Sequence, residues 1–206
     1  IAAVWETIIG GDAKGLAQRI VDFELSYESV KTELAVSVRS LERKAFQTIL
    51  KNRTYHGGIL APGSGLLKHG ENGKGIHSRW YPTTLYKRIV AIGEIRERIE
   101  FIQGDGLEVL ERFKNRSSAS FFIDPPYTVA GKRAGNRLYK CFELDHERLF
   151  SICDSLKGDF LMTYDNEEQV KKLAKKHGFE VREIPMKNTH HAKMRELVIG
   201  KDLSWL

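Results

Sequence analysis

The sequence predicts an α/β fold with an open, mostly parallel sheet, an antiparallel last strand and a helical insertion. Two short runs, 119–123 and 160–164, are apolar and rich in aromatic and branched residues, as buried strands of a parallel sheet are. Two later runs, 179–186 and 195–200, are separated by only a short connection, which favours an antiparallel hairpin. Apolar residues at helical spacing between 28 and 50 predict one amphipathic helix with a basic outer face.

The first half of the chain is expected to contain further short helices. Asp12 is placed to cap a helix that ends near residue 21, because a side-chain oxygen there can accept from a free backbone N–H. Thr83 is placed in the same way to cap a helix that ends before residue 99. Both helices flank the longer amphipathic segment.

A glycine-dense stretch from 55 to 75 separates these helices and is expected to form a loop. Arg53 and Lys74 carry positive charge at this loop, which suits contacts with a polyanion. Arg79 and Trp80 at its exit place a cation beside an aromatic face, a pair that stacks on bases or wedges between them. The alternatives are a plain surface loop and a Trp80 side chain that anchors the loop in the core.

In the second half, strands are expected to alternate with helices. A strand at 99–103 leads into Gly104-Asp105-Gly106, where a helix begins. Asp105 is placed either as the N-cap of that helix or as a ligand-binding carboxylate at the sheet edge. Asp145 is placed to cap a later helix, and Gly178 to end a lysine-rich one that begins near residue 166.

The strongest chemical signal is Asp124-Pro125-Pro126-Tyr127, which directly follows the apolar run 119–123. The two prolines must end the strand, because neither can donate a backbone hydrogen to a ladder. Asp124 is therefore expected at the carboxyl end of a central strand, where open α/β sheets bind ligands. The fixed φ angles of the prolines hold the carbonyls of Asp124 and Pro125 in set directions. A carboxylate, rigid backbone acceptors and an aromatic ring suit a flat base that bears an amino group.

An apolar strand followed by Asp-Pro-Pro-Tyr resembles the signature of DNA methyltransferases that modify amino groups with S-adenosylmethionine. The flanking sequence is similar to that of the Dam-type, or D12 class, adenine-N6 methyltransferases. The supporting stretches are Ala2-Ala3-Val4-Trp5, Ser78-Arg79-Trp80-Tyr81-Pro82, Gly104-Asp105-Gly106, Leu144-Asp145-His146-Glu147-Arg148-Leu149 and Asp202-Leu203-Ser204-Trp205-Leu206. The resemblance covers nearly the whole chain, and the core of four residues is its chemically diagnostic part.

The resemblance implies a role for each matching position. Asp124, Pro125, Pro126 and Tyr127 would form the catalytic motif, and Asp105, Gly106 and Asp124 would bind the cofactor, S-adenosylmethionine. The partner implied is double-stranded DNA with a flipped adenine, and the family also allows a cognate restriction endonuclease that acts separately. The residues expected to contact nucleic acid are Arg53, Lys74, Arg79, Trp80, Lys132, Arg133 and Arg137.

The resemblance also implies a Rossmann-like methyltransferase sheet and a division of the chain into three parts. Residues 1–27 would be a remnant of the methyltransferase core, 28–95 an inserted target-recognition region and 96–206 the catalytic core. The glycine-rich cofactor loop of the family and the acidic residue after its second strand would precede Ile1. We therefore expect an N-terminally truncated member that lacks the first strand or strands of the sheet.

Composition agrees with this class of protein. The chain has 206 residues, 41% of them hydrophobic, which is enough for one sizeable core. Its net charge of +6 favours a polyanionic partner, although a mildly basic protein without one is the alternative. Two cysteines, Cys141 and Cys153, argue against a disulfide framework and a zinc site. This use of cysteine makes a reducing cytoplasm the expected compartment. No apolar stretch approaches membrane-spanning length.

Two other functions fit the same residues. One is an RNA adenine N6-methyltransferase, because the motif does not distinguish the sugar that carries the base. The other is a catalytically inactive, DNA-binding fragment, motivated by the missing glycine-rich loop. Methylation of a protein glutamine is less favoured, because the enzymes of that kind typically have asparagine where Asp124 stands.

Overall fold

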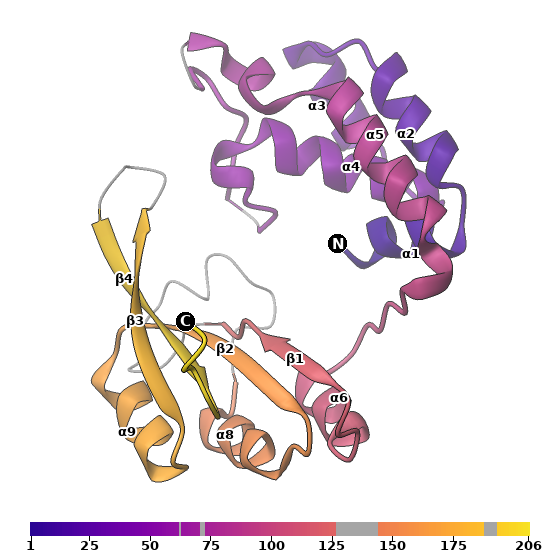
Figure 1. The fold of residues 1–206 in the computed structure, drawn as a ribbon. Coiled ribbons are helices and arrows are strands. Elements are labelled where there is room, and N and C mark those ends of the chain that lie inside the picture. The colour runs from indigo at the N-terminus through magenta and orange to yellow at the C-terminus, as the bar shows by residue number, and fades with distance from the viewer. Residues whose placement is uncertain (62, 71–72, 127–143, 188–192) are drawn as a thin grey trace. The chain divides into compact units, whose positions relative to one another are not determined.

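The computed structural model describes residues 1–61, 63–70, 73–126, 144–187 and 193–206 of the chain. The described residues form two compact units, Ile1–Gln103 and Gly104–Leu206. We call the first the helical unit and the second the sheet unit (Figure 1). Together they make a mixed α/β protein, as the sequence predicts.

The helical unit is built from short helices, and α2, α3 and α4 each begin after a residue whose side chain caps the helix. Asp12 accepts a hydrogen bond from the Gly15 amide at 2.8 Å, and Ser26 and Ser29 form a reciprocal capping box. Its helical elements are α1 (Ala2–Gly10), α2 (Ala13–Asp22), α3 (Tyr27–Ala35), α4 (Leu41–Thr54), η1 (His56–Gly58), η3 (Gly75–Arg79), α5 (Pro82–Glu94) and η4 (Arg96–Arg98).

The prediction of one helix between 28 and 50 is wrong, because α3 ends at Ala35 and α4 begins only at Leu41. The chain is extended at Val36 and again at Ser40, whose hydroxyl accepts a hydrogen bond from the Arg43 amide. A serine that caps the following turn competes with continuation of the preceding helix. The expected cap at Thr83 is also wrong, since α5 begins at Pro82, a favoured first helical residue, and its N-cap is Tyr81, which makes no side-chain cap.

One core holds the helical unit together. Ile8 and Leu16 from the segment 1–27 are buried with Phe46 and Leu85 from the segment 28–95. The two segments, which the sequence assigns to different parts, therefore share one hydrophobic core. Close packing of α2 and α5 depends on Gly93, because a Cβ there would lie 2.9 Å from the Cβ of Ala13.

The described part of the sheet unit contains four strands and three helices around a second core. The strands are β1 (Ser120–Ile123), β2 (Asp159–Asp165), β3 (Glu180–Lys187) and β4 (Lys193–Gly200), and the helices are α6 (Gly106–Phe113), α8 (His146–Ser155) and α9 (Glu168–Lys176). Asp145 caps α8 by accepting from the Arg148 amide at 2.9 Å, as predicted. Gly178, with a φ of +70°, follows α9 in a left-handed conformation that glycine adopts without strain.

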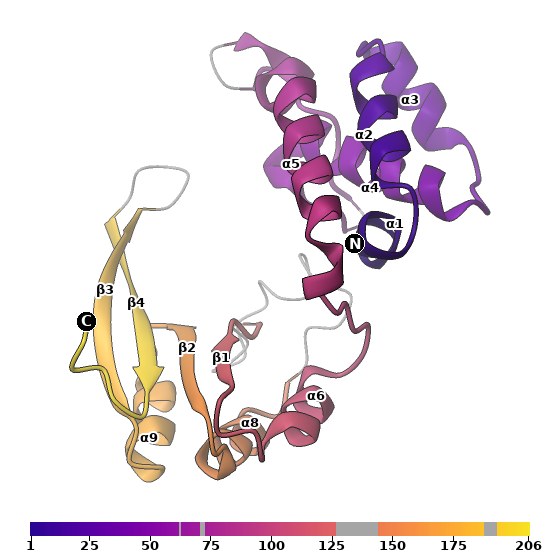
Figure 2. The same ribbon diagram turned by 45° about the vertical axis from the view of Figure 1, so that its right-hand side comes forward.

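The strand order is β1-β2-β4-β3. β1 and β2 are parallel, whereas β4 is antiparallel to both of its neighbours, β2 and β3. It follows that β1, β2 and β3 all run in one direction and β4 alone runs against them (Figures 1 and 2). The predicted hairpin and the predicted reversal of the last strand are both confirmed.

One face of the sheet is covered by its helices. The alternate residues Phe160, Met162 and Tyr164 of β2 pack with Phe150 of α8 and Val170 of α9 in the core of the unit. Because successive strand residues point to opposite faces, the residues between them face the other side. That second face is more exposed.

The predicted strand at 99–103 is wrong, because the residues from 101 to 103 have no regular structure and lie in the helical unit. Among the described strands, β1 is consequently at the edge of the sheet rather than at its centre. The Phe122 side chain is 69% exposed there, although its apolar run predicts a buried strand. Phe121 and Ile123 of β1 pack toward the core, so Phe122 between them points to the more exposed face of the sheet.

Candidate active site

Asp124 lies at the carboxyl edge of the sheet, as the sequence predicts. It directly follows β1, and the register pairs Ile123 with Met162, which brings Asp124 level with Thr163 of β2. The Thr163 hydroxyl, Oγ1, donates a hydrogen bond to Oδ1 of Asp124 at 2.8 Å. Two parallel strands thus hold the carboxylate at the edge where open α/β sheets bind ligands.

Pro125 and Pro126 follow Asp124 and are half-buried. Neither proline can extend the ladder, so β1 ends where the sequence predicts. Four further predicted site residues lie outside the described residues, and these are Tyr127, Lys132, Arg133 and Arg137. The structure therefore positions the first three residues of the predicted catalytic motif.

Two more carboxylates lie at the same edge. Asp165 is the last residue of β2, and it pairs in register with Glu196 of β4. Burial raises the pKa of the Glu196 carboxyl above its ordinary value, and the negative charges of Asp165 and Asp124 raise it further. The edge therefore has a negative potential, which suits a cation.

We expect Glu196→Gln to increase the free energy of unfolding at pH 7. A raised folded-state pKa means that the ionised carboxylate costs stability, and this cost grows as the pH rises from about 4.5 through the folded-state pKa. Below that window, wild type and variant should be equally stable. Denaturant unfolding at pH 4 and at pH 7 measures both values.

Glu183→Gln is the matched control, because its expected effect on the free energy of unfolding has the opposite sign. A hydrogen bond from Lys171, with others from Asn166 and Arg195, lowers the pKa of Glu183 to about 2. The stabilisation by the ionised Glu183 carboxylate is complete above about pH 4.5 and is lost as the pH falls toward about 2. The Glu183→Gln variant should therefore be less stable than wild type at pH 7. Equal effects of the two variants at pH 7 would contradict this account of the edge.

Asp105 is the N-cap of α6. Its Oδ1 accepts a hydrogen bond from the Leu107 amide at 2.9 Å, while Gly106 is the exposed first residue of the helix. The structure thus shows the capping role that the sequence allows for Asp105. The cofactor-binding role of Asp105 and Gly106 stays a prediction.

The basic residues proposed for nucleic acid differ in their surroundings. Lys74 is exposed and Arg53 is half-buried at the end of α4. Arg79 turns inward, where its guanidinium donates to the Asn52 carbonyl and, at 3.1 Å, to the Tyr55 carbonyl. These carbonyls belong to the C-terminal end of α4, so Arg79 satisfies acceptors that the helix itself leaves open.

Trp80 is only 8% exposed and belongs to the core of the helical unit. Its ring meets Phe23 edge to face, with 6.1 Å between ring centroids. This favours the alternative reading, in which Trp80 anchors the glycine-rich loop in the core, over base stacking by Arg79 and Trp80.

We expect Arg79→Ala to destabilise the helical unit by about 1–3 kcal/mol, because it leaves partly buried carbonyls without their charged donor. Lys74→Ala in the same segment, where the side chain is exposed, should change stability by less than about 0.5 kcal/mol. Urea unfolding of both variants tests the difference. If the two variants were equally stable, the inward hydrogen bonds of Arg79 would not contribute to the stability of the helical unit.

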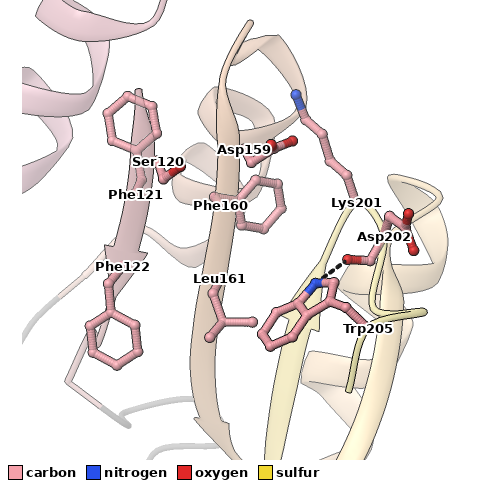
Figure 3. A pocket seen from close by; sticks show the side chains of 9 residues that line it. All are labelled: Ser120, Phe121, Phe122, Asp159, Phe160, Leu161, Lys201, Asp202 and Trp205. Atoms are coloured by element: carbon pink, nitrogen blue, oxygen red, sulfur yellow. Dashed lines mark hydrogen bonds between the residues drawn. The ribbon is translucent and has the colours of Figure 1, made fainter. Parts of the chain in front are cut away.

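A shallow depression of about 510 Å³ lies on the more exposed face of the sheet (Figure 3). It is lined by Ser120, Phe121, Phe122, Asp159, Phe160, Leu161, Lys201, Asp202 and Trp205. Ser120 and Asp159 are the first residues of their strands, so the depression lies toward the end opposite to Asp124. The Lys201 ammonium there donates hydrogen bonds to the carbonyls of Leu156 and Gly158.

Other kinds of site are not found among the residues that the structure describes. No group of three or more histidine, cysteine, aspartate or glutamate side chains in these ranges is arranged to hold a metal ion. No helix there is long and apolar enough to span a bilayer. Burial raises the pKa of the Cys153 thiol to about 12, which keeps it protonated and unreactive at neutral pH.

Thr163 and Glu196 are site residues that the sequence does not single out. The apolar run 160–164 hides Thr163, which is recognised only when β1 and β2 are set in register. Glu196 reaches the edge because β4 inserts beside β2.

No family model matches this sequence, and no curated protein matches it.

Proposed function

We propose that this chain carries the catalytic motif of an S-adenosylmethionine-dependent methyltransferase that acts on the N6 amino group of adenine in DNA. The observation that carries the proposal is the position of Asp124-Pro125-Pro126. A carboxylate followed by two rigid residues lies at the carboxyl edge of parallel strands, and a hydrogen bond from Thr163 holds it.

The sheet supports the proposal as well. Strands β1, β2 and β3 run in the same direction, and β4 lies between β2 and β3 and runs in the opposite direction. This is the pattern expected for the methyltransferase sheet. The helices on one face supply the layer that an α/β sheet needs. The finer assignment, a Rossmann-like methyltransferase fold, is part of this proposal.

The residues present fit the cofactor in their charge. Asp124, Asp165 and Glu196 make the edge negative, as the influence of both aspartates on the pKa of Glu196 indicates. S-adenosylmethionine, when bound, supplies a methyl group attached to a positively charged sulfur. Carboxylates at the edge would favour such a cation, and Asp105 at the start of α6 offers one more.

The chemical task of Asp124 follows from the target. An exocyclic amino nitrogen is a poor nucleophile, because its lone pair is delocalised into the ring. If Asp124 and the Pro125 carbonyl accept its two hydrogens, the nitrogen can become pyramidal and direct its lone pair outward. Acceptors that are fixed in advance also stabilise the positive charge that develops on this nitrogen. The proton can leave after transfer, so Asp124 need not act as a strong base.

The base must leave the duplex before it reaches this edge, at a cost of a few kcal/mol. Tyr127, the fourth residue of the motif, is proposed to stack on the flipped base, a contact worth about 1–3 kcal/mol. Lys132, Arg133 and Arg137 follow in the sequence and are proposed to contact phosphates.

Methyl transfer tests the proposal directly. The chain is incubated with radiolabelled S-adenosylmethionine and either unmethylated duplex DNA or RNA of the same sequence, and N6-methyladenine is measured in both. Label in DNA supports the proposal, and label in RNA alone favours the RNA enzyme. DNA binding without cofactor binding or transfer would favour the inactive DNA-binding protein.

A further inference from the structure

The hydrogen bond between Thr163 and Asp124 joins residues that are 39 positions apart in the sequence. Thr163 lies inside β2, and its neighbours on both sides are fixed by pairing with β1 and β4. A β-branched side chain has restricted χ1 in such a strand. The Thr163 hydroxyl is thus a rigidly placed donor, and it contacts Asp124 just past the end of β1.

The electrostatic surroundings make this contact more important. Asp165, two residues after Thr163 in β2, and Glu196, its partner in β4, bring negative charge to the same edge. Like charges repel, so these groups favour orientations of Asp124 that turn its carboxylate away from them. A hydroxyl donor at 2.8 Å opposes this repulsion by holding Oδ1 beside β2.

We infer that Thr163 is a positioning residue, which orients the Asp124 carboxylate for the target amino group. This inference rests on the proposed function. The hydrogen bond to Oδ1 restrains the direction of the Asp124 carboxylate, and acceptor direction decides whether the amino nitrogen can become pyramidal. Thr163 acts through Asp124, and its removal should therefore affect the reaction step more than substrate or cofactor binding.

Two variants separate the hydroxyl from the rest of the side chain. Thr163→Val has nearly the same shape without the hydroxyl, and Thr163→Ser keeps the hydroxyl without the methyl. We expect Thr163→Val to lower kcat by about 10–100-fold with little change in the KM for DNA or S-adenosylmethionine. Thr163→Ser should restore most of the lost kcat.

Thr48→Val in α4 is the control for the substitution itself, since its hydroxyl bonds only within its own helix at 2.8 Å from the Lys44 carbonyl. It should leave both constants unchanged, and melting temperatures confirm that all variants fold. The inference is overturned if folded Thr163→Val keeps the wild-type kcat. It is equally overturned if Thr163→Ser loses as much activity as Thr163→Val.

A crystal structure of Thr163→Val gives a readout that does not depend on activity. The inference expects the Asp124 carboxylate to occupy more than one orientation in this variant and a single one in Thr163→Ser. A single, wild-type orientation in both variants would overturn the positioning role even if transfer falls. Absence of transfer by the wild-type chain would instead overturn the proposed function, and this inference with it.

Discussion

Asp124→Ala is expected to lower methyl transfer on the order of 10³-fold, because it removes a preorganised acceptor from the reacting nitrogen. The side chain is exposed at the end of β1, so the sheet should fold without it. Initial rates with S-adenosylmethionine and unmethylated duplex DNA measure the loss, and circular dichroism reports on the fold.

Asp159→Ala is the matched control for this result. Asp159 is also an exposed aspartate, but it is the first residue of β2 and so lies at the opposite edge of the sheet. Its removal should leave the rate within about twofold of wild type, as for surface substitutions away from a site. A folded Asp124→Ala variant with near wild-type transfer would show that the motif does not perform the chemistry.

Phe150→Ala is expected to destabilise the sheet unit by about 3–5 kcal/mol, the usual cost of truncating a fully buried phenylalanine. Phe150 is completely buried on α8, and its ring centroid lies 5.9 Å from that of Tyr164 and 6.0 Å from that of Phe179. Its loss leaves a cavity between the helix and the covered face of the sheet. Urea unfolding followed by far-UV circular dichroism measures the change.

Phe122→Ala provides the comparison, because it removes the same side chain from the more exposed face. Phe122 is 69% exposed, so its truncation should cost less than about 1 kcal/mol. If both variants lost the same stability, the assignment of the helix-covered face as the core of the sheet unit would be wrong.

Much of the sheet unit could be predicted from the sequence. The run 160–164 has a strong local pattern, and β2 covers it with one more residue at each end. The hairpin of β3 and β4 follows from two strand patterns with a short connection, and the caps at Asp12 and Asp145 follow from chemistry within a single turn. These features depend on contacts close in sequence.

The wrong predictions involve competition between local signals or contacts that are distant in sequence. The apolar spacing between 28 and 50 continues past Ala35, but the chain becomes extended at Val36 and a new helix begins after the capping serine, Ser40. The run 99–103 has the composition of a strand, but composition does not supply a partner strand. Phe122 is exposed because it lies on the face of the sheet opposite to the helices, which an apolar run does not reveal.

The candidate site shows the same division. Asp124 is recognisable because the prolines after it end the strand in any α/β sheet. Thr163 and Glu196 depend on strand register, and the inward direction of Arg79 depends on where α4 ends. A cation beside an aromatic residue has the same sequence pattern on a surface as in a core.

The position of β4 between β2 and β3 sets an order for the assembly of the sheet. During synthesis, β2 emerges well before β4 and β3 emerges just before it, so β2 waits longest with an unpaired edge until residues 193–200 have left the ribosome. The edge that carries Asp124 includes Glu196 from this late strand. A nascent chain released before that point would expose two strand edges, and we expect chaperones and proteases to recognise it as unfinished.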